Sequence, residues 1–223
     1  MRFKPHAVKS IRVKPQVRAA VASLLSEHGL TLPLGEAEAA TAAGESPSPV
    51  VARVSLEALD QGGLEARTAG RAQDVILALD HITDPRNLGA IIRSAAFFGV
   101  REVIVPERRQ VLFTQAAVGT AQGGFALTDL VVVVNLARTL AALKAKGYWV
   151  VGTAMDGEPY TDVAHVYDKV VLVLGSEDTG LSKNVRDLCD RLAAIPGRAG
   201  GLDSLNVSVA SGIFLSAFGG ARV

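Results

Sequence analysis

The stretch KVVLVLGSEDTGLS, residues 169–182, joins an uninterrupted run of valine and leucine to a polar loop that contains two glycines. An apolar run without polar alternation is typical of a strand buried on both faces, as the strands of parallel sheets are. Gly175 and Gly180 allow backbone conformations that other residues resist, so exposed N–H groups of this loop could hold the polar edge of a cofactor. A plain turn between a strand and a helix is the alternative interpretation.

Apolar runs of the same kind alternate with helical patterns from Asp74 onward. The other expected strands are VILAL (75–79), EVIVP (102–106), LVVVV (130–134), YWVVG (148–152) and LAAIP (192–196). Helical patterns begin at about Gly89 and occur at 114–122, 136–146 and 181–191, and a closing helix ends the chain. The alternation predicts an α/β fold, a parallel sheet with helices on both faces, and ligands bind such sheets at the carboxyl ends of their strands.

The residues before Asp74 predict a small α/β N-terminal domain, so we expect two domains, 1–73 and 74–223. A helical pattern covers QVRAAVASLLSEHG (16–29), EAEAATAAGESPSP (36–49) predicts a linker, and a strand and a short helix follow. Before the first acidic residue stand the basic residues Arg2, Lys4, Lys9, Arg12, Lys14 and Arg18. This basic arm could neutralise nucleic-acid phosphates, or it could be a solvated and partly disordered tail.

Composition excludes several classes of protein. The chain has 223 residues, 49% of them hydrophobic, and a net charge of only +1, so its overall charge gives no sign of a nucleic-acid partner. The single cysteine, Cys189, excludes a disulfide framework, and four scattered histidines give no zinc-ligand spacing. The start MRFKPHAVKS has no apolar leader and no apolar run is long enough for a bilayer, so we expect a cytoplasmic protein without a membrane partner.

The loop after the first strand of the sheet begins the stretch DHITDPRNLGAIIRSAAFFG, residues 80–99. Asn87 is a candidate cap for the following helix, and Arg93 lies on its first or second turn. If Asn87 is the cap, its amide and the Arg93 guanidinium can converge at the start of the helix. The alternative is an ordinary capped helix with a surface arginine.

The third unusual loop, IPGRAGGLDSLNVS at residues 195–208, places Ser204, Asn206 and Ser208 directly before the closing helix. Ser204 as a helix cap would explain one of these polar residues only. The sequence contains no G-x-G-x-x-G after a strand, no P-loop and no G-x-S-x-G. A Rossmann-type oxidoreductase, a P-loop nucleotide hydrolase and a serine hydrolase therefore lack their usual sequence signals.

In order and spacing, the three loops resemble the motifs of the SpoU (TrmH-type) RNA ribose 2′-O-methyltransferases of the SPOUT superfamily. The matching stretches are DPRNLGAIIR, LVLGSEDTGLS and IPGRAGGLDSLNVSVASG, and the resemblance covers about residues 75–218. It implies transfer of a methyl group from S-adenosylmethionine to an RNA ribose 2′-hydroxyl. It also implies a homodimer and a deep trefoil knot at the C-terminal end, without a metal.

The same resemblance assigns roles to individual residues. The cofactor residues that it implies are Thr153, Gly175, Ile195 and Leu205, and the catalytic set is Arg93, Asn87, Glu177, Ser204 and Asn206. A guanidinium with a pKa above about 12 is a poor proton acceptor, so we expect Arg93 to stabilise the developing alkoxide, with general-base action kept open. The other four residues would orient Arg93, the ribose or the cofactor.

The substrate prediction rests on the stretch LDQGGLEAR, residues 59–67, which is similar to the end of the N-terminal RNA-binding domain of rRNA-modifying relatives. It favours rRNA, and tRNA stays possible. A non-catalytic RNA-binding or RNA chaperone protein that keeps the knotted fold is the alternative function. The complete set of Asn87, Arg93, Glu177 and Asn206 argues against that alternative.

Overall fold

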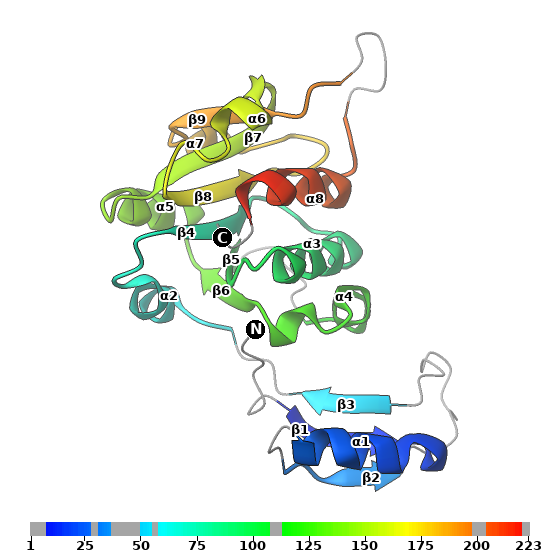
Figure 1. Cartoon of the computed structure of the whole chain (residues 1–223). Helices are drawn as coiled ribbons and strands as arrows, with labels where there is room; N and C mark the ends of the chain where they lie inside the picture. Colours follow the sequence, from blue (N-terminus) through cyan, green and yellow to red (C-terminus); the bar gives the residue numbers. More distant parts are fainter. Residues whose placement is uncertain are drawn as a thin grey trace. The chain divides into compact units, whose positions relative to one another are not determined.

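The structure, a computed structural model, describes residues 8–27, 31–36, 50–54, 58–107, 113–197 and 204–219. The chain forms two compact units, Met1–Glu57 and Ala58–Val223 (Figure 1). The division lies earlier than the predicted domain boundary at residue 73. Helix α2 (Gln61–Thr68) contacts strand β6 and places Leu64 in the core of the larger unit, so the larger unit includes it.

The smaller unit is a three-stranded sheet with one helix. Strand β1 (Val8–Val13) lies between β2 (Leu34–Glu36), which is parallel to it, and β3 (Val50–Val54), which is antiparallel. Helix α1 (Pro15–Glu27) confirms the helical pattern predicted over 16–29. The Arg18 guanidinium on α1 donates a hydrogen bond of 3.1 Å to the Leu34 carbonyl on β2.

The basic arm is divided between described and undescribed residues. Lys9 and Arg12 lie on β1 and Arg18 lies on α1, so this part of the arm belongs to regular secondary structure rather than to a tail. Arg2 and Lys4 lie outside the described residues, as do residues 37–49 of the predicted linker.

The larger unit contains a six-stranded sheet in which every pair of neighbouring strands is parallel. The predicted parallel α/β sheet is therefore confirmed. The strands in spatial order are β6 (Asp129–Val133), β5 (Glu102–Pro106), β4 (Asp74–Leu79), β8 (Lys169–Leu174), β7 (Trp149–Pro159) and β9 (Arg191–Ala194).

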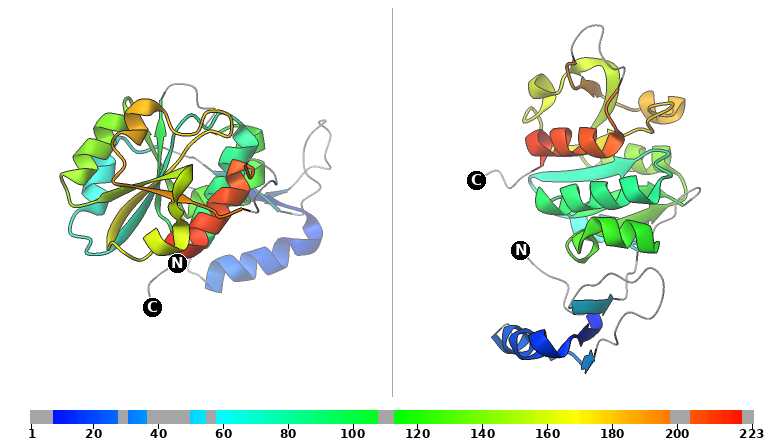
Figure 2. Two further views of the ribbon diagram at one scale, coloured as in Figure 1. Left: turned by 90° about the horizontal axis from the view of Figure 1, so that it is seen from above. Right: turned by 90° about the vertical axis from the view of Figure 1, so that its right-hand side faces the viewer.

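Helices cover both faces of this sheet (Figure 2). One face carries α2, α5 (Leu136–Lys144) and α7 (Lys183–Arg186), which share a hydrophobic core with alternate residues of the strands. The other face carries α3 (Pro85–Phe97), which lies between α4 (Gln115–Ala121) and α8 (Val207–Phe218). A 3₁₀ turn, η2 (Gly124–Ala126), contacts α3, and the short α6 (Tyr160–Val163) contacts α8.

The central strands explain why the apolar runs do not alternate with polar residues. On β4, Ile76 and Ala78 belong to the core beneath α2 and α5, and Leu77 and Leu79, whose side chains point to the opposite face, are equally inaccessible to solvent. A strand buried on both faces has no position for a polar side chain, so valine, isoleucine and leucine occupy consecutive positions.

Two predicted helices differ from the observed ones. The helix expected from Gly89 begins at Pro85, because Asp84 caps it by accepting a hydrogen bond from the Arg86 N–H at 2.7 Å, and proline suits the first helical turn. The helix expected over 181–191 is only the short α7. Its continuation is prevented because the N–H of Asp190 joins the sheet by donating to the Val150 carbonyl at 2.8 Å.

A buried charged cluster joins the amino ends of the sheet strands. Arg71 donates hydrogen bonds of 2.8 Å to both carboxylate oxygens of Glu102 and one of 2.9 Å to Asp74. The second oxygen of Asp74 accepts the Tyr148 hydroxyl at 2.5 Å. The Glu102 side chain is only 1% exposed, so its charge depends on Arg71 for compensation.

Replacing Arg71 with methionine removes this compensation and leaves a buried carboxylate without its cation. We expect Arg71→Met to lower the free energy of unfolding by about 3–5 kcal/mol, the usual cost of breaking a buried ion pair on one side. Chemical denaturation measures the change. The matched control is Lys183→Met, which breaks the ion pair between Lys183 and Asp187. Because the Lys183 side chain is 86% exposed, we expect this substitution to change the free energy of unfolding little. Equal losses in the two variants would contradict this account of the cluster.

Candidate functional site

Three loops with unusual sequences leave the carboxyl edge of the parallel sheet. They follow strands β4, β8 and β9, and their residues are brought together because parallel strands end at the same edge. The first loop leads into α3, the second into α7 and the third into α8. The site is therefore assembled from segments that are far apart in the sequence.

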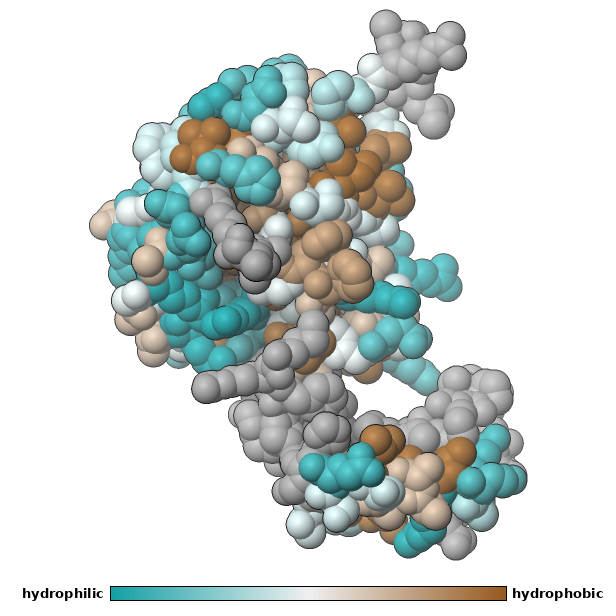
Figure 3. Space-filling model, in the orientation of Figure 1, coloured by the Kyte–Doolittle hydropathy of each residue, from teal (hydrophilic) through white to brown (hydrophobic). Residues whose placement is uncertain are grey.

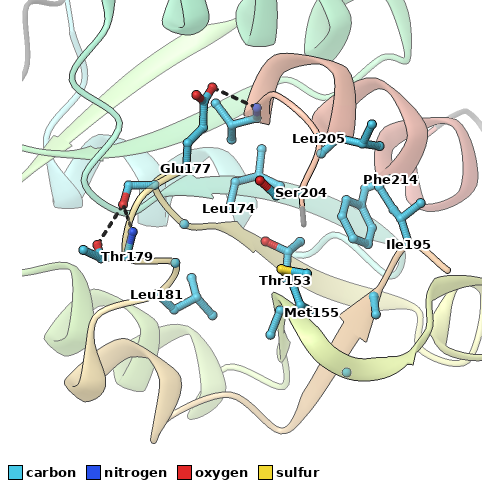
Figure 4. Close-up of a pocket in the computed structure, with 18 of the residues that line it drawn as sticks. Thr153, Met155, Leu174, Glu177, Thr179, Leu181, Ile195, Ser204, Leu205 and Phe214 are labelled. Atoms are coloured by element: carbon cyan, nitrogen blue, oxygen red, sulfur yellow. Dashed lines mark hydrogen bonds between the residues drawn. The ribbon is translucent and has the colours of Figure 1, made fainter. Parts of the chain in front are cut away.

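One carboxylate oxygen connects the three loops. Glu177 Oε1 accepts hydrogen bonds from Asn87 Nδ2 at 2.9 Å, from Asn206 Nδ2 at 2.6 Å and from the Val207 backbone N–H at 3.0 Å (the last drawn in Figure 4). Asn206 Nδ2 also donates to Asn87 Oδ1 at 3.2 Å. We call Asn87, Glu177 and Asn206 the polar cluster. Three of the five predicted catalytic residues thus lie in mutual hydrogen-bond contact.

The side-chain oxygen of Asn206 fixes the start of α8. Its Oδ1 accepts the Ser208 N–H at 3.0 Å and the Ser208 hydroxyl at 2.5 Å, so Asn206 is the cap of this helix. The alternative in which Ser204 is the cap is therefore wrong. An asparagine two residues further on provides the same side-chain oxygen and also reaches Glu177.

Arg93 is placed differently from the prediction. Asn87 is not the helix cap but lies in the first turn of α3, two residues after Pro85, since Asp84 holds the capping position. Six helical positions correspond to about 600° of rotation, so Asn87 and Arg93 point in different directions from α3. The expected convergence through a cap is wrong. Arg93 is exposed, and no hydrogen bond or ion pair joins it to the polar cluster among the described residues.

The loop after β8 is folded tightly on itself. Ser176 and Gly180 exchange backbone hydrogen bonds of 3.1 and 3.0 Å, and the Ser176 hydroxyl accepts the Thr179 N–H at 3.2 Å. Gly180 has φ +65°, the left-handed region that favours glycine. A Cβ atom on Gly175 would lie 2.3 Å from the Gly180 carbonyl carbon, so only glycine fits where the strand meets the returning loop.

Asp80 is a buried residue of the site that the sequence did not single out. Its carboxylate, 3% exposed, accepts the Ser182 N–H at 2.7 Å and lies 2.7 Å from His81 Nδ1. It therefore fastens the end of the loop after β8 to the end of β4. The sequence signal that could have identified Asp80 is the Asp-His pair directly after an apolar strand. In the structure, the second residue of this pair, His81, has a positive φ of 60°.

These loops enclose one side of a pocket of about 1100 Å³ (Figure 4). All four predicted cofactor residues line it, namely Thr153, Gly175, Ile195 and Leu205. Glu177 and Ser204 line it as well, so the polar cluster contacts the pocket through Glu177. Asn87, Asn206 and Arg93 are not among its described lining residues.

The opposite wall of the pocket comes from the long strand β7, which bends away from β8. β7 pairs with β8 only over residues 149–152, and its pairing with β9 shifts register between Thr153 and Glu158. Residues of this bend, together with Leu174 and Phe214, give the pocket apolar walls. Figure 3 shows apolar patches among hydrophilic residues on one face of the molecule. Apolar walls with a few polar groups are typical of small-molecule sites.

Several other kinds of chemistry find no support in the described part of the chain. No group of three histidine, cysteine, aspartate or glutamate residues there could hold a metal ion. Burial raises the pKa of the Cys189 thiol to about 11, so the thiolate nucleophile is scarce at neutral pH. Among the described helices, none is both long and apolar enough to cross a membrane.

The fold and the site define an α/β protein with a small-molecule pocket and a neighbouring polar cluster at the carboxyl edge of a parallel sheet. The sequence profile of the SpoU rRNA Methylase family matches residues 74–216. The chain belongs to this family, as its three loop motifs predicted.

Individual relatives agree with this assignment. The chain is 41% identical over 177 residues to the 23S rRNA (guanosine-2′-O-)-methyltransferase RlmB of Photobacterium profundum, covering 78% of this chain and 71% of that protein. It resembles the crystal structure of the SpoU methyltransferase AviRb from Streptomyces viridochromogenes in complex with AdoMet, with a TM-score of 0.74, 25% identity and coverage of 93% and 80%. An AdoMet-bound rRNA methyltransferase from Sinorhizobium meliloti gives a TM-score of 0.70 at 27% identity, with coverage of 94% and 78%.

Gly175 provides a direct test of the loop geometry. A methyl group at this position meets backbone atoms that cannot rotate away, so we expect Gly175→Ala to lower the free energy of unfolding by about 1–3 kcal/mol. The matched control is Gly119→Ala, because a Cβ atom there meets nothing within 4 Å and alanine favours the helix α4. Chemical denaturation of both variants measures the difference. Unchanged stability of Gly175→Ala would show that the loop packs less closely than described.

Proposed function

We propose that the pocket binds S-adenosylmethionine and that the protein methylates ribose 2′-hydroxyl groups of RNA. The protein is an RNA 2′-O-methyltransferase by its family, and two of the relatives named above are rRNA methyltransferases by name, so rRNA is favoured over tRNA as the substrate. The observation that carries the proposal is the pocket itself. It brings Thr153, Gly175, Ile195 and Leu205 together beside a polar cluster that can orient a reacting hydroxyl.

The lining of the pocket suits this cofactor. The apolar surfaces of Ile195, Leu205 and Phe214 provide walls against which a flat adenine ring can pack, and backbone groups are available to its polar edge. Bound S-adenosylmethionine supplies an electrophilic methyl group on a sulfonium. The residues of the chain then have to bind the cofactor, orient the ribose and stabilise charge on the attacking oxygen.

The proposed role of the polar cluster is to position the ribose. Glu177 Oε1 is already shared by three N–H donors, so its carboxylate is held in one orientation at the pocket wall. Asn87 and Asn206 fix that orientation, and the Ser204 hydroxyl, exposed in the pocket wall, is available to the ribose or to a phosphate. These residues act as positioning groups rather than as nucleophiles.

Arg93 is the proposed stabiliser of the developing alkoxide. A hydroxyl is a poor nucleophile until it loses its proton or until its growing negative charge is compensated. The Arg93 guanidinium is exposed on α3, the helix that also carries Asn87, so it is accessible to an RNA backbone. General-base action by Arg93 is the less favoured form of the proposal, since a guanidinium rarely gives up its proton.

The remaining parts of the proposal concern assembly. We propose a C-terminal trefoil knot in which the last segment of the chain threads through a loop, a homodimer, and a cytoplasmic location. The contact of Val207 and Asn206 with Glu177, in the loop after β8, supports such a threading. We also propose that the N-terminal domain binds RNA, with Arg12 on its strand and Arg18 on its helix as phosphate contacts.

Ligand binding provides the first test. S-adenosylmethionine at a hundredfold excess over its dissociation constant is expected to raise the free energy of unfolding by about 2.7 kcal/mol, because it binds only the folded state. NAD serves as the control nucleotide and is expected to leave the thermal transition unchanged. A transition that shifts with NAD alone would contradict the assigned cofactor.

Substitution of Arg93 tests the proposed chemistry. Arg93→Ala is expected to keep the fold and the cofactor affinity but to lower methyl transfer by about 10² to 10⁴, the range for losing a charge stabiliser or a general base. Arg93→Lys separates two roles, since lysine restores the charge without the planar fork. Substantial rescue favours charge stabilisation, and near-complete loss favours bidentate positioning. Wild-type single-turnover rates in Arg93→Ala would remove Arg93 from the mechanism.

A further inference from the structure

The pocket is lined by more negatively charged than positively charged side chains. Two carboxylates, Glu177 and Asp178, line it together with one guanidinium, that of Arg186, which is the single cationic side chain among its described lining residues. Their formal charges sum to −1. S-adenosylmethionine carries the opposite distribution, with two cationic groups, the sulfonium and the ammonium, and one carboxylate. A ligand with this pattern needs one positive partner inside the pocket.

Arg186 is held at the pocket by a weak partner. It lies at the end of α7, and its Nη2 donates to Asp156 Oδ2 at 2.7 Å. Asp156 belongs to the bend of β7, between the lining residues Met155 and Gly157. The two side chains are 38% and 71% exposed. An ion pair this exposed contributes at most about 1 kcal/mol, so exchanging Asp156 for another carboxylate costs little.

The segment around α7 has anchors other than the Arg186 side chain. The segment around α7 is held by Val185, which is 2% exposed in the core, and by the hydrogen bond of Ser182 N–H to the buried Asp80. The two side chains that form the ion pair are thus free to separate while the loop after β8 keeps its place. The Arg186 guanidinium lies in the pocket wall, and its only partner named above is the exposed carboxylate of Asp156. A cation in this position suits an anionic part of the ligand.

We propose that Arg186 is the binding residue for the carboxylate of the cofactor's methionine portion, and that Asp156 is its partner in the absence of cofactor. The inference rests on the proposed function, because it takes S-adenosylmethionine as the ligand of this pocket. A guanidinium presents two parallel N–H donors that match a carboxylate, and such charge-assisted pairs are stronger than neutral hydrogen bonds. Glu177 and Asp178 provide the complementary negative charge for the two cationic groups.

Calorimetric titration with two ligands tests the inference. The probes are S-adenosylmethionine and 5′-methylthioadenosine, which keeps the adenosine and the sulfur but has no amino-acid portion. Arg186→Met is expected to weaken S-adenosylmethionine binding by about 10- to 100-fold, the value of a hydrogen-bonded charge, and to leave 5′-methylthioadenosine binding unchanged.

Asp156→Asn is the matched control. It breaks the same ion pair but keeps the guanidinium, so we expect S-adenosylmethionine to bind at least as tightly as to the wild type. Unchanged S-adenosylmethionine affinity in Arg186→Met would overturn the inference, as would an equal loss for both ligands. An equal loss of S-adenosylmethionine affinity in Asp156→Asn would show that the ion pair matters for structure alone. Failure of the wild type to bind either ligand would instead reject the proposed function.

Discussion

The arrangement of the site depends on a single carboxylate oxygen, Glu177 Oε1, that is shared by three N–H donors. The donors come from the first turn of α3 and from the first residues of α8, and Glu177 itself lies in the loop after β8. A carboxylate with this many donors holds one orientation, since each donor would lose a charge-assisted hydrogen bond if it turned. The pocket, the polar cluster and the start of the last helix are therefore fixed relative to one another.

One close approach of backbone and one buried hydrogen bond make that arrangement possible. Gly175 lets the loop after β8 return against its own strand, and the resulting turn presents Glu177 toward α3 and α8. Asp80 then ties the end of the same loop to β4 through Ser182. The bend of β7 opens the space that these contacts enclose, because it stops pairing with β8 after Gly152. The same bend carries Asp156, so the pocket opening and the Arg186 ion pair have one structural origin.

Local sequence patterns predicted the sheet well. A run such as Val170–Leu174 is buried on both faces, and for that reason it contains only valine and leucine. They were less successful at helix ends, because Asn87 was the candidate cap of the first helix but Asp84 caps it and the helix begins at Pro85. The family motifs selected Glu177 and Asn206, but the hydrogen bonds between them could not be predicted from spacing. Asp80 and Ser182 lie 102 positions apart, and only the folded sheet brings them together.

The most direct test of the account is single-turnover transfer of a labelled methyl group from S-adenosylmethionine to rRNA that lacks ribose methylation. Wild-type protein and Glu177→Ala should be compared, and the labelled position mapped by its resistance to alkaline hydrolysis. We expect the wild type to label a ribose 2′-oxygen, which makes the adjoining phosphodiester alkali-stable, and Glu177→Ala to be strongly impaired although it remains folded. Label on a base, or transfer by Glu177→Ala at the wild-type rate, would show that the proposed function or the role of Glu177 is wrong.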